Sequence, residues 1–387
     1  MTEQPVVRPR ALASAALICF CAGGLYGWSA LIPVIEHELG GTTEQSGFVF
    51  SVAIVAFTIA VIVTPRLPVV FNGLHSCVVF GCCGAAFLVL AAFASSYHWF
   101  LLTFGIGYGF CSGAIYINAL ATAAQSARPA VITPLMVASF GMGGAVYGFI
   151  WRWFVVHDWG ALALLPLVVS LVVACAVGFA AYGRLKLVNT VKKSVPTTSG
   201  SREKPGAFIL LWLSFALGSA GGLMVLGLAG KMTDSVGAPA SITSIAIVGV
   251  ALGNTFGRLS VSGLNYKFKP INSALLAVSM TALGLVIMTL ATTPWYLVVG
   301  LIIVATGYGA VASTIPALVS TIYGKDNFAR VFSSVFTAWG VAGLLAPWLA
   351  GAIHDRAGDF QMAILIALLA TFGSAATLLT LKWNALR

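Results

Sequence analysis

The chain has 387 residues, of which 59% are hydrophobic and 8% are charged. A soluble domain carries about 25% charged residues, so this composition excludes a water-covered surface and predicts a protein that lies mostly in lipid. The net charge is +10. In a soluble protein this charge would suggest a nucleic-acid partner, but here the basic residues flank apolar stretches, and we expect no nucleic acid to bind.

Apolar stretches long enough to cross a bilayer recur along the whole chain. They are predicted to be helices, because lipid offers the backbone no hydrogen-bond partner. In chain order the predicted spans are 12–35, 46–66, 74–95, 98–122, 130–153, 159–183, 206–230, 239–263, 271–291, 295–322, 329–351 and 360–382. No cleavable signal peptide is expected, since the first apolar run is long and leads directly into a second.

A polar stretch at 184–205 divides the twelve spans into two sets of six. It contains six basic residues together with Ser, Thr, Gly and Pro, a composition typical of a linker. We therefore expect an N-terminal six-helix bundle over 1–183, a cytoplasmic linker over 184–205 and a C-terminal six-helix bundle over 206–387.

The two halves repeat short motifs at an offset of 198 to 200 residues. The matches are AGGL at 22–25 and 220–223, GYG at 107–109 and 307–309, and SFGMGG at 139–144 with AWGVAG at 338–343. The order of the matches predicts two pseudo-symmetric six-helix bundles in an all-α membrane protein. Duplicated halves with a substrate site between them near the midplane are typical of secondary transporters.

The basic residues are distributed unevenly between the two sides of the membrane. Alternating the spans from a cytoplasmic N-terminus places sixteen of the twenty Lys and Arg inside, and only Arg152, Lys231 and Arg356 outside. This asymmetry predicts that both termini are cytoplasmic, in a bacterial inner membrane. Arg152, which has tryptophan on either side, is interpreted as an anchor at the outer membrane surface.

Small residues at helical spacing mark two stretches, 141–148 and 340–351. Such faces let two helices approach closely. They are compatible with plain tight packing and equally with an interface that moves.

Arg258 is the one charged residue between 235 and 266, nine residues before Lys267. That distance places it about two and a half turns inside the predicted span. A guanidinium stays charged and is expensive in lipid, so it needs an anion or backbone carbonyls. All ten acidic residues fall in tails, loops or span ends, so we favour an exogenous carboxylate; a structural latch that bonds carbonyls at the membrane surface is the alternative.

The motifs GGLYGWSALIPVIE at 23–36, SARPAVITPLMVASFGMGGAVYG at 126–148, GNTFGRL at 253–259 and YGKDNFARVFSSVFTAWGVAGLLAPWLAGAIHD at 323–355 carry a resemblance. Over its whole length the chain resembles the major facilitator superfamily, and within it the oxalate/formate antiporters and related monocarboxylate transporters. The resemblance implies the major facilitator fold, transport by alternating access, and a monomer.

Two positions depart from the patterns of the families that the chain resembles. Oxalate transporters carry a lysine where this chain has Trp339, and the loss of a second cation argues against oxalate. Animal monocarboxylate carriers carry an Asp beside the arginine of the eighth span, where this chain has Asn254 one turn earlier.

The candidate substrate-binding residues all lie within predicted spans. They are Arg258, Asn254, Tyr116, Tyr26, Phe140, Trp339, Tyr147 and Asn118. Asn254 lies four residues before Arg258, on the same helical face, and either assists a carboxylate or bonds a neighbouring helix. The resemblance favours Tyr116 and Tyr26 as lining residues. Phe140 and Trp339 occupy equivalent positions in the two repeats, where they either border a ligand or pack.

These features predict a secondary transporter of a small organic anion, a monocarboxylate, that works with a proton or a counter-anion. An exporter of drugs or hydrophobic metabolites is the alternative, and a sensor on the same fold is a third hypothesis. No phosphate-binding loop, carboxylate pair or histidine cluster is present in the sequence, so we expect neither an enzyme nor a cofactor or metal.

Overall fold

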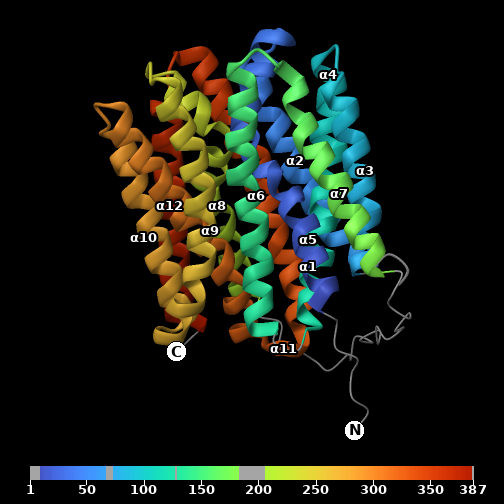
Figure 1. Ribbon diagram of the computed structural model, residues 1–387. Coiled ribbons are helices and arrows are strands. Elements are labelled where there is room, and N and C mark those ends of the chain that lie inside the picture. Colours follow the sequence, from blue (N-terminus) through green and yellow to red (C-terminus); the bar gives the residue numbers. More distant parts are fainter. Residues whose placement is uncertain (1–8, 67–72, 127–128, 183–204, 386–387) are drawn as a thin grey trace.

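The computed structural model describes residues 9–66, 73–126, 129–182 and 205–385. These residues form a bundle of long helices that run from one end of the molecule to the other (Figure 1). Residues 184–204 of the predicted linker lie outside the described residues, as do 1–8 and 386–387.

The N-terminal half contains several interrupted helices. Its elements are α1 (Pro9–Ala22), η1 (Gly23–Leu31), η2 (Val34–Glu38), α2 (Thr43–Val63), η3 (Thr64–Arg66), α3 (Leu74–Ala92), α4 (Tyr97–Phe100), η5 (Leu101–Tyr108), α5 (Gly109–Ala124), α6 (Pro129–Val156), η6 (Gly160–Leu164) and α7 (Leu165–Tyr182). The start of α2 is fixed by a capping box, in which Thr42 and Gln45 each bond the other's backbone N–H.

The C-terminal half contains five helical elements, one of which includes two spans. They are α8 (Pro205–Asp234), α9 (Ala240–Lys267), α10 (Pro270–Thr289), α11 (Pro294–Ala357) and α12 (Gln361–Ala385). Within α11 the backbone leaves the helical region at Gly324, where φ is 77°. Glycine adopts this conformation without a steric penalty, and it separates the tenth and eleventh spans.

Twelve stretches of the described residues are long and apolar enough to cross a membrane. The predicted number of spans is therefore confirmed. The outward faces remain apolar, with Phe93, Leu290 and Leu369 each more than two thirds exposed. In water such faces would be unfavourable, so the molecule is an integral membrane protein.

The two halves meet in a pseudo-symmetric arrangement. Helix α2 packs against the part of α11 that forms the eleventh span, while α6, the fifth span, packs against α9, the eighth. Exchanging the halves converts the first pair into the second. The described helices thus form the all-α fold of two pseudo-symmetric six-helix bundles that the repeat predicted.

Both glycine-rich stretches lie at this seam between the bundles. A side chain at Gly141 would meet Thr255 of α9, and one at Gly343 would meet Ile54 of α2. The absence of a side chain is what lets these helices touch. The close approach that small residues allow is present at both stretches, and it joins the two bundles.

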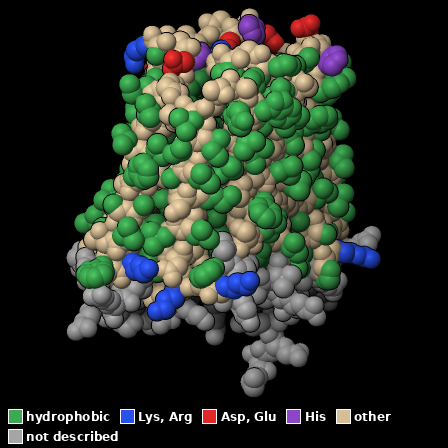
Figure 2. Space-filling view, turned by 90° about the vertical axis from the view of Figure 1, so that its left-hand side faces the viewer, with side chains coloured by type: hydrophobic (Ala, Val, Ile, Leu, Met, Phe, Trp, Pro, Cys, Tyr) green, Lys and Arg blue, Asp and Glu red, His purple; other side chains and the backbone are tan. Residues whose placement is uncertain are grey.

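The charged residues gather at opposite ends of the bundle. Glu36, Glu44, Asp158, Asp234 and Asp355 lie at one end, here called the acidic end, and Lys267, Lys269, Lys382 and Arg10 lie at the other, the basic end. In Figure 2 the carboxylates and histidines of the visible face appear at the top and most of the Lys and Arg at the bottom.

Candidate functional site

A cavity of about 970 Å³ lies between the two bundles. Its inner end is formed by Tyr26, Arg258 and Trp339, while Pro65 and Ala124 line it near the basic end. Tyr26 is 4% exposed and Trp339 2% exposed, whereas Pro65 and Ala124 are exposed. The cavity is therefore deep inside the protein at one end and open toward the basic end.

Arg258 extends from α9 to the inner end of the cavity. Its Nε donates to Oδ1 of Asn254 at 3.2 Å, and its Nη2 donates to the hydroxyl of Tyr26 at 3.2 Å. The ring of Tyr26 lies 5.9 Å from the guanidinium carbon, as does the ring of Tyr308. Because Tyr26 belongs to the first bundle and Arg258 to the second, this bond crosses the interface inside the membrane.

The guanidinium forms no ion pair with any described carboxylate. The amide nitrogen of Asn254 is buried next to it and likewise has no hydrogen-bond partner among the described residues. A cation thus lies at the end of the cavity, and an unused donor is buried beside it, outside the lining residues. Chemically, this arrangement is suited to a carboxylate, which accepts hydrogen bonds from several donors.

Tyr308 and Trp339 support the guanidinium from within the second bundle. The indole Nε1 of Trp339 donates to the hydroxyl of Tyr308 at 2.6 Å, and both side chains are buried. This bond fixes the ring of Tyr308 under Arg258. It also orients the indole of Trp339, which lines the cavity.

The predicted site residues fall into three groups, which lie at the cavity, behind its lining, or elsewhere in the first bundle. Tyr26, Tyr116, Arg258 and Trp339 line the cavity, and Asn254 bonds Arg258. Phe140 lies behind this lining, edge-on to the ring of Tyr26 at 5.0 Å and to that of Tyr116 at 5.1 Å.

Tyr147 and Asn118 lie away from the lining, which corrects their expected placement. The side-chain oxygen of Asn118 accepts from the backbone N–H of Gly73, just before α3, and its side-chain nitrogen donates to the Ala114 carbonyl. Asn118 therefore links α5 to the start of α3. The Tyr147 hydroxyl contacts Cys21 inside the first bundle. In each case the side chain bonds a polar group within the first bundle instead of lining the cavity.

Sequence reasoning missed the aromatic residues that complete the wall. Phe57 of α2 and Phe336 of α11 line the cavity and contact Trp339 at ring distances of 5.4 and 5.2 Å. The chain contains 24 phenylalanines, and nothing in the local sequence distinguishes these two. Their role depends on contacts between spans that lie far apart in the chain.

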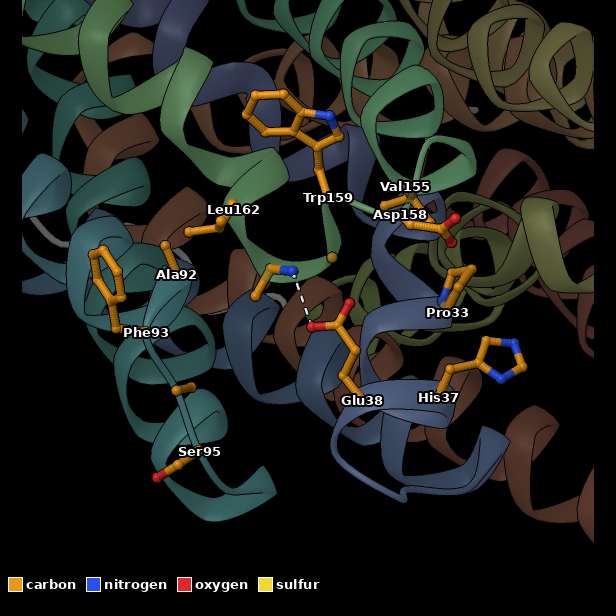
Figure 3. A pocket seen from close by; sticks show the side chains of 13 residues that line it. Pro33, His37, Glu38, Ala92, Phe93, Ser95, Val155, Asp158, Trp159 and Leu162 are labelled. Atoms are coloured by element: carbon orange, nitrogen blue, oxygen red, sulfur yellow. Dashed lines mark hydrogen bonds between the residues drawn. The ribbon is translucent and has the colours of Figure 1, made fainter.

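A second, shallower cavity of about 630 Å³ lies at the acidic end (Figure 3). Glu38 and Asp158 line it, together with His37 and Trp159. The Glu38 carboxylate already accepts from the backbone N–H of Ala161 at 3.2 Å, as the dashed line shows. This hollow is exposed and lies over the first bundle alone, so it lacks the position between bundles that a transport site requires.

The acidic end is closed by polar contacts between the bundles. Arg152 and Asp234 form two hydrogen bonds at 3.2 and 3.3 Å, and Lys231 bonds Glu36 at 2.6 Å. The sequence-based interpretation of Arg152 as a surface anchor is incomplete, because its side chain is only 10% exposed and paired. A cavity open at one end and closed at the other is one state of an alternating-access carrier.

No family model matches the chain. The chain is similar to an uncharacterized MFS-type transporter, YhjX, of Escherichia coli strain K12. The two are 23% identical over 340 residues, which cover 84% of this chain and 83% of the relative. Together with the twelve-helix fold, this similarity supports placing the chain among the membrane transporters of the major facilitator superfamily.

Proposed function

We propose that the chain is a secondary transporter of a small organic anion, a monocarboxylate, with Arg258 as the residue that binds the carboxylate. The observation that carries this proposal is the guanidinium at the inner end of a cavity between the bundles, without a described carboxylate as partner. A planar guanidinium can form two parallel hydrogen bonds to a carboxylate. An anion from outside would therefore complete the site.

Asn254, Tyr26 and Tyr116 contribute the remaining polar contacts in this proposal. The amide nitrogen of Asn254 is a second donor beside the guanidinium, and the Tyr26 hydroxyl lies within hydrogen-bond distance of Arg258. Trp339 borders the ligand, and Phe140 holds the tyrosine rings from behind. The bundles rock about this site, and the molecule works as a monomer.

The same proposal includes an orientation and a mode of coupling. The basic end faces the cytoplasm of a bacterial cell in the inner membrane, because Lys and Arg accumulate on that side. The cavity lining contains no carboxylate among the described residues. The anion therefore travels either with its own proton or in exchange for a counter-anion.

The alternative function is an exporter of drugs or hydrophobic metabolites. The observation that favours it is the lining, since most of the described residues around the cavity are apolar. The two functions differ in what Arg258 does. An exporter of neutral compounds keeps its activity without the guanidinium, whereas an anion carrier loses binding.

The proposal is tested by the thermal stability of the purified protein in the presence of acetate, lactate, benzoate and oxalate. A ligand that binds the folded state raises the melting temperature, with about 2.7 kcal/mol of stabilisation at a concentration 100 times Kd. We expect a monocarboxylate to stabilise the wild type and to have no effect on Arg258→Gln. Arg356→Gln, which removes an exposed arginine at the acidic end, is the matched control and keeps the response.

If Arg258→Gln responds to carboxylates like the wild type, the proposed role of the guanidinium is wrong. Stabilisation of both proteins by neutral hydrophobic compounds alone favours the exporter. In proteoliposomes, faster uptake after acidification of the outside supports a proton as the coupled ion. A requirement for an internal anion supports exchange.

A further inference from the structure

The wall of the cavity next to Arg258 is built from aromatic rings of both bundles. Tyr116 of α5 and Phe336 of α11 are half-buried and border the open space, one from each bundle. Between them Phe57 and Trp339 form a floor, each 2% exposed. The floor crosses the seam between the bundles, where the ring centroids of Phe57 and Trp339 lie 5.4 Å apart.

The rings form one continuous set rather than isolated contacts. Tyr116 lies 5.5 Å from Phe57, and Phe336 lies stacked on Trp339 at 5.2 Å. Phe332, Phe336 and Trp339 follow one another at four- and three-residue spacing along α11, so they share one helical face. A flat apolar group in the cavity would therefore contact rings on two sides and below.

The charges of the lining limit what the cavity accepts. Arg258 is the one charged side chain among the described residues that line it, and the polar remainder consists of hydroxyl groups. One negative charge can be matched at the inner end. A second carboxylate would find no further cation among the described lining residues, which is unfavourable in a largely apolar site.

The cavity has room for a ligand larger than a very small anion. Its volume of about 970 Å³ lies at the upper end of the roughly 300–1,000 Å³ that sites for drug-sized ligands occupy. A ligand with a ring beyond its carboxylate would use both the cation and the aromatic wall.

We infer that the substrate is a monocarboxylate with a flat, ring-sized apolar body, and that Phe336 and Tyr116 determine this specificity. The inference rests on the proposed function, since it places the carboxylate on Arg258. The ring lies over Phe57 and Trp339, between side chains of the two bundles. Ring-to-ring contacts in edge or offset geometry add binding energy beyond the burial of area, so a planar ring is favoured over an open alkyl chain.

The inference is tested first on the wild type with three probes that differ in one feature each. These are propionate, 3-phenylpropionate and the neutral 3-phenylpropanol, measured by thermal shift or calorimetry. We expect 3-phenylpropionate to bind at least about tenfold tighter than propionate, because a buried ring adds more than one aromatic contact. We expect 3-phenylpropanol to bind at least about tenfold more weakly than 3-phenylpropionate, because it lacks the charge.

Variants then test whether the aromatic wall of the cavity causes the preference for 3-phenylpropionate over propionate. Phe336→Ala is expected to reduce the ratio of the 3-phenylpropionate affinity to the propionate affinity about tenfold, and Phe336→Tyr is expected to restore the ratio. Phe372→Ala is the matched control, because Phe372 lies on the outer surface of α12 and is 54% exposed. Tyr116→Leu tests the wall from the other bundle and is expected to lower the same ratio.

The outcomes separate this inference from the proposed function. If propionate and 3-phenylpropionate bind equally well to the wild type and neither binds to Arg258→Gln, the ring-sized body is refuted and the anion carrier stands. If no carboxylate binds in a way that depends on Arg258, both fail. An unchanged affinity ratio in Phe336→Ala and in Tyr116→Leu removes these two residues as determinants.

Discussion

At the scale of single residues, Asn254 decides whether Arg258 is available to a ligand. Its Oδ1 accepts from Arg258 Nε at 3.2 Å, and its amide nitrogen has no partner among the described residues. A neutral amide orients the guanidinium without neutralising it. The charge of Arg258 therefore remains for an incoming anion.

The change Asn254→Asp should convert this open site into a closed one. The new carboxylate replaces an oxygen already within hydrogen-bond distance of Arg258, so an internal ion pair forms. We expect the melting temperature without ligand to rise and the response to a monocarboxylate to disappear at neutral pH.

The matched control is Asn272→Asp, which adds the same charge in the first turn of α10, away from the cavity. It should leave the ligand response unchanged. If Asn254→Asp still responds fully to a monocarboxylate at neutral pH, Arg258 is not the group that binds the carboxylate.

The position of Asn254 on the same helical face as Arg258 could be predicted from the sequence. Tyr26, which bonds Arg258 across the interface, could be predicted only as one of several aromatic candidates. The two residues are four apart on one helix, and this spacing alone places them on the same face. Tyr26 lies 232 residues away, and its contact depends on how two bundles pack. The same limit explains why Phe57 and Phe336 were missed, since no local pattern records which ring faces the seam.

At the scale of helices, the glycines of the eleventh span let α11 pack against α2. A side chain at Gly351 would meet the backbone of Thr43 and Glu44 near the acidic end. Backbone atoms of a helix cannot move aside as the tip of a side chain can. This part of the seam therefore closes only while residue 351 has no side chain.

The change Gly351→Val should hold the acidic end of the seam apart. Overpacking costs about 1–3 kcal/mol, so we expect the rate of substrate exchange in proteoliposomes to fall about tenfold. Gly206→Val is the control, since a side chain there meets nothing within 4 Å. Wild-type exchange in Gly351→Val would show that this contact does not limit closure.

The positions of the membrane-spanning helices could be predicted from hydrophobicity. The fourth span was predicted at 98–122 and extends over Tyr97–Ala124, whereas the eleventh, predicted at 329–351, extends over Val331–Ala357. Hydrophobicity does not predict that η1 interrupts the first span. At η1, a side chain at Gly23 would meet the backbone of Phe140. That distortion arises from tertiary contact, so the sequence of the span alone does not predict it.

At the scale of the whole molecule, the polar contacts between the bundles that involve described residues are concentrated at the acidic end. Besides the two ion pairs, Asp355 of α11 accepts from the backbone N–H groups of Thr43 and Glu44, at the start of α2. A carboxylate at a helix N-terminus is stabilising. Together these contacts hold closed the end opposite the cavity, and each must break before the carrier opens there.

Asp234 connects this closure to three helices. It accepts two hydrogen bonds from Arg152 of α6 and a third, at 2.7 Å, from Thr243 of α9. Removing its charge leaves the guanidinium of Arg152 buried without a counter-charge. Leaving a buried polar group unpaired costs about 1–3 kcal/mol, and more where the group is charged. This cost raises the free energy of the state that is closed at the acidic end, because Arg152 is buried against residue 234 only in that state.

The change Asp234→Asn should therefore shift the carrier toward opening at the acidic end. We expect hydrogen–deuterium exchange to increase over residues 36–44 and 234–243 and to decrease over 116–124, which border the cavity, because the opposite end closes as the acidic end opens. Asp359→Asn is the control, since Asp359 bonds only the nearby backbone of Gln361 among the described residues. Equal exchange in the two variants would mean that the pair with Arg152 does not hold the acidic end closed, and the remaining contacts of Glu36 and Asp355 would then carry the closure.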